Sequence, residues 1–125
     1  MNRMMTFIVL ALSAATVETN TLAANDQSKG TAFKVASDSR ARYFLLGVVP
    51  GKRGNIIATT RREGSSGTRF ARREINCSAQ TYRYLGEGDN VKQTYRPNYS
   101  VGEMSDLVDG SISDVVVKFA CSRRR

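Results

Sequence analysis

The chain has 125 residues, with 19 lysines and arginines against 11 aspartates and glutamates, so its formal net charge is +8. This length suits one domain. The chain contains no histidine and two cysteines, which excludes histidine-based triads, histidine-ligated zinc and an iron–sulfur cluster held by this chain alone. No nucleophile–base arrangement is visible, so we predict no catalytic residue, no metal, no cofactor and a protein that is not an enzyme.

Residues 1–24 are typical of a secretory signal peptide. Arg3 provides a positive start, residues 4–15 are apolar, and the small residues Ala23 and Ala24 suit a signal peptidase. The apolar run is shorter than the roughly 20 residues that span a bilayer, which disfavours a membrane anchor. We therefore predict export, to the periplasm or the cell surface, with cleavage after Ala23 or Ala24.

The rest of the chain is expected to form one domain. Residues 25–30 are polar and predict a flexible leader, and residues 31–125 follow as a single unit. No second apolar segment is long enough to cross a membrane, so we predict no transmembrane segment in the mature chain. Cleavage would remove Arg3 and Glu18, one charge of each sign, so the mature chain would keep its net charge of +8.

Short segments rich in β-branched and aromatic residues predict strands. Turns are expected at Ser37 to Ser39, at Pro50-Gly51, at Glu63 to Gly67 and at Gly86 to Asn90, where glycine, proline and small polar residues gather. The strands expected between these turns cover residues 31–36, 42–49, 55–60, 68–77, 80–85 and 91–95.

The C-terminal region predicts a helix over residues 112–121. Ser111 followed by Asp114 resembles a capping box, and apolar residues recur at helical spacing after it. Three consecutive valines would also suit a strand. With the helix, the fold class is α+β: an antiparallel sheet of about five or six short strands, with the C-terminal helix packed on one face.

Cys77 and Cys121 are the two cysteines, and an exported domain with two thiols most often pairs them. The bond would fasten the helix to the strand that ends at Cys77. Two free buried thiols, or a bond to another chain, are the alternatives. Neither cysteine has a histidine or a C-x-x-C partner, which disfavours a catalytic role.

Arginines flank the glycine–serine turn at residues 64–67. If the flanking strands form a hairpin, these side chains would converge at one end and suit carboxylate, phosphate or sulfate groups. The alternative is a solvated face, partly neutralised by Glu63 and Glu74. The candidate binding residues are Arg61, Arg62, Arg69, Arg72 and Arg73.

Two segments resemble the surface-adhesin protein E family. The first is Ile75-Asn76-Cys77 followed by Thr81-Tyr82-Arg83-Tyr84-Leu85, and the second runs from Gly110-Ser111 to a helix that ends in Ala120-Cys121. The resemblance extends roughly over residues 33–121. It implies an exported α+β domain with one disulfide, and adhesion to host extracellular proteins, a role in virulence.

These observations leave more than one function open. The first is a non-enzymatic, adhesin-like binding protein that docks a protein or a polyanionic glycan through the arginine-rich hairpin end. The alternative is a periplasmic accessory or assembly component of an envelope secretion or conjugation machine. A small hydrolase or its inhibitor comes third. Exposed strand edges would permit a homodimer. Tyrosines interleaved with arginines suit single-stranded nucleic acid, but an exported protein seldom meets it.

Overall fold

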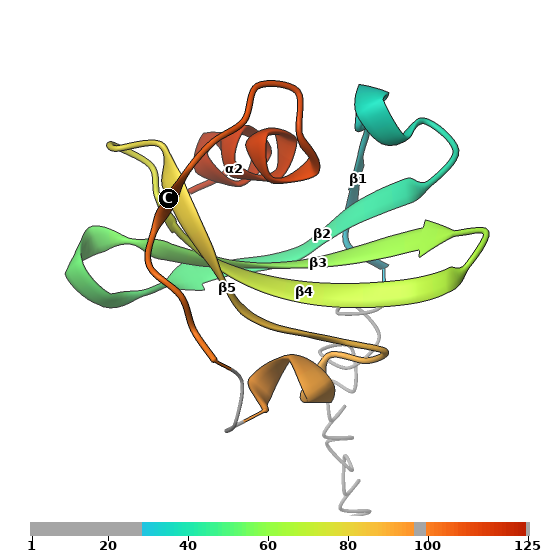
Figure 1. Cartoon of the computed structure of the whole chain (residues 1–125), viewed down its shortest axis with the longest axis horizontal. Coiled ribbons are helices and arrows are strands. Elements are labelled where there is room, and N and C mark those ends of the chain that lie inside the picture. Colours follow the sequence, from blue (N-terminus) through green and yellow to red (C-terminus); the bar gives the residue numbers. More distant parts are fainter. Residues whose placement is uncertain (1–28, 97–99, 125) are drawn as a thin grey trace, which may run out of the picture.

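The computed structural model describes residues 29–96 and 100–124. Six antiparallel strands follow one another in chain order across one sheet, and the helix α2 (Ile112–Ser122) crosses one face of it (Figure 1). This confirms the α+β prediction. The strands are β1 (Thr31–Phe33), β2 (Arg42–Pro50), β3 (Ile56–Gly64), β4 (Gly67–Asn76), β5 (Thr81–Gly88) and β6 (Ser105–Asp106).

Two predicted segments lie largely outside the described residues. These are the signal peptide, 1–24, and the leader, 25–30, of which only the last two residues are described. Across 29–96 and 100–124, no helix is long and apolar enough to cross a membrane.

The centre of the sheet is built from strands β2 to β5. β3 pairs with β4 over its whole length, from Ile56 opposite Ile75 to Gly64 opposite Gly67. Gly67 has a φ of 114°, a conformation that favours glycine, and this permits the tight turn between the two strands. The predicted hairpin around residues 64–67 is therefore present.

The hydrophobic core lies between the sheet and α2. Leu45, Ile56, Ala58 and Ile75 contribute from the strands, and Val117 and Ala120 contribute from the helix. The rings of Phe33 in β1 and Phe119 in α2 stack at 5.0 Å and extend the core toward the edge of the sheet.

The capping prediction for α2 is confirmed. The side chain of Ser111 accepts a hydrogen bond from the amide of Asp114 at 3.1 Å, and Asp114 accepts from the amide of Gly110 at 2.9 Å. The Gly110 amide, and then the ammonium of Lys118, lower the pKa of the Asp114 carboxyl. Because the helix is capped in this way, the strand alternative for residues 112–121 is wrong.

The predicted disulfide is also confirmed. Cys77 follows β4 and Cys121 lies in the last turn of α2, and the two are bonded with their Cα atoms 5.8 Å apart. The alternatives of free thiols or a bond to another chain are therefore wrong. The bond fixes the C-terminal turn of α2 to the sheet.

The strand predicted over residues 91–95 is wrong, because the short helix η3 (Lys92–Tyr95) occupies this segment. The Asn90 side chain accepts from the amide of Gln93 at 2.9 Å, which turns the chain into a helix. The helix packs on β5, which extends through the predicted turn as far as Gly88. An added Cβ at Gly86 would overlap the carbonyl of Thr94, so glycine is what allows this close approach.

The remaining differences are at the ends of the sheet. The strand predicted over residues 31–36 stops at Phe33, because the short helix η1 (Ala36–Asp38) follows it. Another short helix, η2 (Lys52–Gly54), joins β2 to β3. The strand β6 was not predicted, since two residues are too few to show an alternating pattern.

Candidate functional site

The structure places the predicted arginines on opposite faces of the sheet, because successive side chains of a strand alternate. Arg61 lies on the face away from α2, with its guanidinium over the ring of Phe44 at 4.3 Å and its Nε donating to Glu63 at 3.1 Å. Arg62 lies on the other face and donates to Asp38 at 2.8 Å. The hairpin therefore does not gather these two side chains.

Arg62 belongs to a network with Asp38 and Tyr43. Hydrogen bonds from Arg62 and then Tyr43 lower the pKa of the Asp38 carboxyl. Burial, followed by the hydrogen bond to Asp38, raises the pKa of Tyr43 to about 12. Asp38 is therefore ionised and Tyr43 neutral near pH 7, and this network joins η1 to β2 and β3.

Arg73 lies inside the molecule, where it is 3% exposed. It donates to the hydroxyls of Thr60 at 3.1 Å, Ser113 at 3.2 Å and Tyr84 at 2.8 Å. No carboxylate in the described part of the chain forms an ion pair with it. A buried guanidinium with three hydroxyl partners holds β3, β4, β5 and α2 together, and it is not accessible to a ligand.

The last two predicted arginines are also engaged. Arg72 stacks on the ring of Tyr95 at 3.6 Å and donates to the carbonyl of Thr94 at 3.3 Å, which holds η3 against the sheet. Arg69 is exposed and pairs with Asp89 at 2.8 Å. The five arginines thus lie in separate environments, and they do not form one patch.

The outer edge of β2 offers a different candidate. β1 pairs only with Tyr43 to Leu45, so the following residues of β2 have no neighbouring strand on that side among the residues described. At the far end, the Gly51 amide donates to the carbonyl of Asn55 at 2.7 Å, toward β3. Because backbone groups alternate in direction, the amide and carbonyl of Val48 and the carbonyl of Pro50 point outward.

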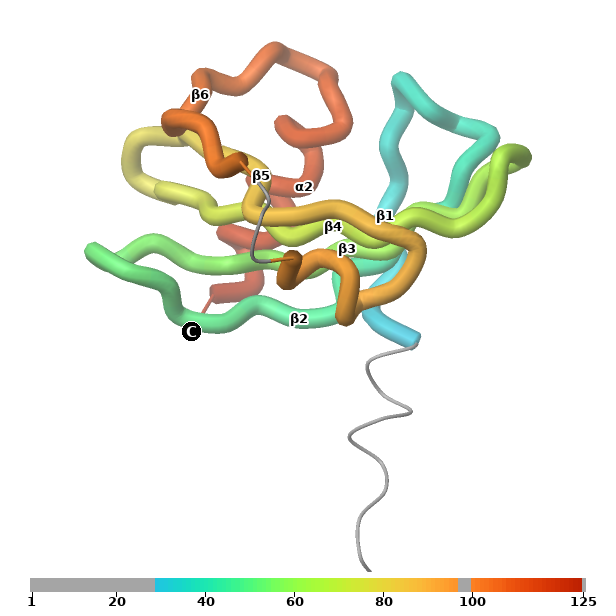
Figure 2. The backbone as a smooth tube through the Cα atoms, turned by 60° about the horizontal axis from the view of Figure 1, so that its bottom comes forward, coloured from blue at the N-terminus to red at the C-terminus, as the bar shows by residue number. Residues whose placement is uncertain are grey.

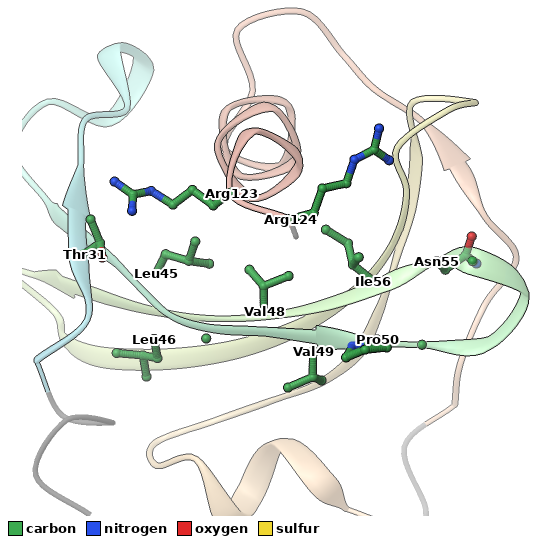
Figure 3. A pocket seen from close by; sticks show the side chains of 13 residues that line it. Thr31, Leu45, Leu46, Val48, Val49, Pro50, Asn55, Ile56, Arg123 and Arg124 are labelled. Carbon is green, nitrogen blue, oxygen red and sulfur yellow. The ribbon is translucent and has the colours of Figure 1, made fainter. Parts of the chain in front are cut away.

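A cleft of about 700 Å³ runs along this edge, beneath the C-terminal end of α2 (Figure 3). Leu45, Val48 and Ile56 form its floor. The side chain of Arg123 extends above Leu45 toward β1, and that of Arg124 extends away from the floor toward the turn between β4 and β5. Figure 2 shows the C-terminal end of α2 beside β2, at the rim of the sheet.

The two arginines that line this cleft form no ion pair with the described residues, and the charge of Lys52 in the adjoining turn acts on Glu74 from a longer range. Arg123 packs over the ring of Phe119 at 4.8 Å. Within residues 29–96 and 100–124 no ion pair involves Arg123, Arg124, Lys52 or Arg53, whereas Arg42, Arg61, Arg62 and Arg69 at the other end of the hairpin are all paired. Free positive charge therefore gathers at the open edge and the β2–β3 turn, opposite the predicted position.

A second, smaller pocket lies across the sheet from the cleft. Its volume is about 130 Å³. Two of its side chains are unusually accessible for large apolar groups: Val49 is 54% exposed and Tyr95 is 59% exposed. The lining residues are Leu46, Gly47, Val49, Ile57, Thr59, Val91 and Tyr95.

A third cavity, of about 380 Å³, lies beside the β2–β3 turn and holds an internal ion pair. Burial opposes ionisation of Glu74, but hydrogen bonds from Asn55 and Arg83 lower the pKa of its carboxyl. Glu74 and Arg83 are paired at 2.7 Å, so the charge of Arg83 is already balanced. This cavity is therefore a weaker candidate than the cleft.

The described residues contain no candidate metal site. No group of three or more cysteine, aspartate or glutamate side chains among them could hold a metal ion, and both cysteines are oxidised. No family model, curated protein or solved structure matches the chain. The resemblance to the surface-adhesin protein E family therefore stays a prediction.

Proposed function

We propose that this protein is an exported, non-enzymatic binding module that takes an extended polypeptide segment as an added strand along the open edge of β2. The observation that supports this most strongly is the outward-facing backbone of Val48 and Pro50 beside a cleft of about 700 Å³. An edge strand with free amide and carbonyl groups is a template for another chain.

Strand addition uses main-chain hydrogen bonds for affinity and pockets for alternate side chains for selectivity. Both parts are available here, because the cleft lies on one face of the edge and the smaller pocket on the other. The disulfide ties α2 to the sheet beside the cleft. Such preorganisation reduces the entropy lost on binding.

Export is supported by the signal-like residues 1–24 and by the disulfide, which persists in oxidising compartments. The periplasm and the cell surface both provide that environment. An adhesin-like role at the surface and an accessory role in an envelope machine would each present a polypeptide partner. The β2 edge supports either role better than the arginine hairpin, whose side chains have partners within the fold.

Selection from a library of random peptides would test this function. We expect the oxidised protein to enrich peptides that slow hydrogen exchange at the outward-facing amide of Val48. The variant Gly47→Asp should lose them, because it places a carboxylate on the edge. An added Cβ at Gly47 meets no atom within 4 Å, so the fold should tolerate the change.

Gly102→Asp is the matched control, because a Cβ there also meets no atom within 4 Å and Gly102 lies away from the edge. It should bind the selected peptides as the unchanged protein does. Enrichment of no peptide at all, or equal binding to the Gly47→Asp and Gly102→Asp variants, would contradict strand addition at β2.

A further inference from the structure

The two faces of the open edge carry different chemistry. The side chains of Leu45 and Val48 point toward α2, where Arg123 and Arg124 lie above them (Figure 3). Leu46 and Val49 point to the opposite face (Figure 3). A strand added to this edge would continue both faces, with its own side chains alternating between them.

The face beneath α2 is positively charged. Arg123 and Arg124 line the cleft, and the exposed Lys52 and Arg53 of the adjoining turn line the third cavity, beside Glu74. None of the four forms an ion pair within the described residues. Arginine donates to carboxylates in a two-pronged geometry, so every second side chain of the added strand meets a surface suited to carboxylates.

The opposite face is apolar. Leu46, Val49 and Tyr95 line the pocket of about 130 Å³. Arg72 holds the Tyr95 ring in place by stacking on it at 3.6 Å. A cavity of about 150 Å³ holds a benzene molecule, so this pocket has room for one aliphatic side chain. The side chains of the added strand that alternate with the carboxylates would meet this pocket.

Charge also argues against a second copy of this chain as the occupant. Each copy has a net charge of +8, and an edge-to-edge dimer would bring the cations around both clefts together. Like charges placed opposite one another oppose association. A negatively charged segment of another protein gains from the same field, especially at low salt.

From this geometry we infer that the partner is an extended protein segment in which acidic and aliphatic side chains alternate, with the carboxylates facing Arg123 and Arg124 and an aliphatic side chain in the Leu46–Val49–Tyr95 pocket. This inference rests on the proposed function, since it requires strand addition at β2. It adds the chemical class of the partner.

Three synthetic peptides of about eight residues test this pattern. In the first, glutamate and valine alternate; in the second, lysine replaces glutamate; in the third, serine replaces valine. Titration calorimetry should give the Glu/Val peptide an affinity at least about tenfold above the other two, a difference of about 1.4 kcal/mol. Binding of the Glu/Val peptide should weaken as salt is raised.

The double variant Arg123→Gln, Arg124→Gln should reduce affinity for the Glu/Val peptide about tenfold. Lys34→Gln with Arg40→Gln is the matched control, because it removes the same charge from exposed residues outside the cleft. The control should retain most of the affinity. Equal losses of affinity in the two double variants would show that net charge alone determines binding, and this would overturn the inference.

Amide exchange at Val48 separates failure of this inference from failure of the proposed function. Protection of Val48 by the Lys/Val peptide as strongly as by the Glu/Val peptide would overturn the acidic partner and leave strand addition standing. No protection by any synthetic or selected peptide would overturn both. The inference would also be overturned if the protein bound heparin and none of the peptides, or if sedimentation showed a dimer formed through the β2 edge.

Discussion

Cys77 and Cys121 join the end of β4 to the last turn of α2, two residues before Arg123. The bond therefore holds the base from which Arg123 and Arg124 extend over the open edge of β2. The disulfide thus fixes the position of the charged side of the cleft relative to the sheet.

Replacing both cysteines by serine is expected to lower the free energy of unfolding by roughly 3–4 kcal/mol. The bond joins two residues 44 positions apart, and without it the unfolded chain regains the conformational entropy of the loop between them. Urea unfolding with and without reductant measures this. The affinity for the Glu/Val peptide should fall as well. Equal unfolding midpoints for oxidised and reduced protein would argue against the bond as a source of stability.

Arg73→Ala should destabilise the fold by about 2–4 kcal/mol, because it leaves a cavity and removes the donor shared by two buried hydroxyls and the part-buried hydroxyl of Tyr84. Arg69→Ala removes the same side chain from an exposed ion pair and should change stability by less than about 1 kcal/mol. Thermal unfolding of both variants gives the comparison. Similar losses would show that Arg73 does not hold the core together.

Gly86→Ala should destabilise by about 1–3 kcal/mol, since its Cβ would overlap the Thr94 carbonyl and push η3 away from β5. Gly102→Ala meets no atom within 4 Å and should stay within about 0.5 kcal/mol of the unchanged protein. Because Tyr95 lies in η3, Gly86→Ala should also weaken binding of the Glu/Val peptide. An undisturbed melting temperature in Gly86→Ala would contradict the close packing of η3.

Acid should destabilise the protein through Asp38. Its pKa is lowered in the folded state from a reference value of 3.8, so its contribution is present above that value and is lost as the pH falls through the folded pKa. We expect the melting temperature to fall below about pH 4. The melting temperature of the Asp38→Asn variant should be lower than that of the unchanged protein at pH 7, and it should fall less as the pH is lowered.

Asp106→Asn is the control for this pH series, because Asp106 is exposed and has no ion pair in the described residues. Its acid profile should follow that of the unchanged protein. An Asp38→Asn profile parallel to the unchanged protein's would show that the Arg62–Asp38–Tyr43 network does not determine acid stability.

Local signals were enough to predict much of this fold. Segments rich in β-branched and aromatic residues between glycine-containing turns predicted the central strands, and Ser111 with Asp114 predicted the start of α2. The disulfide followed from two cysteines in a chain whose first residues predict export. The strands and the helix start depend on residues that are neighbours in the chain, and each cysteine has one possible partner within the chain. The sequence therefore specifies these features directly.

The parts that were missed depend on contacts between distant residues. Arg62 has its partner in Asp38, 24 positions earlier, and Arg72 is held by Tyr95 in a helix predicted as a strand. Counting arginines around a turn therefore could not show which charges remain free. The open edge of β2 lies beyond Leu45, because β1 begins at Thr31, the partner of Leu45, and the length of that pairing is not visible in the sequence.

Residue-resolved amide hydrogen exchange at Val48 tests strand addition most directly. In the free protein its outward amide should exchange faster than that of Val49, which faces β3. Saturation with the Glu/Val peptide should slow Val48 at least about tenfold, a protection of about 1.4 kcal/mol, and leave Val49 nearly unchanged. An amide of Val48 that exchanges equally fast with and without bound peptide would contradict a strand added to β2.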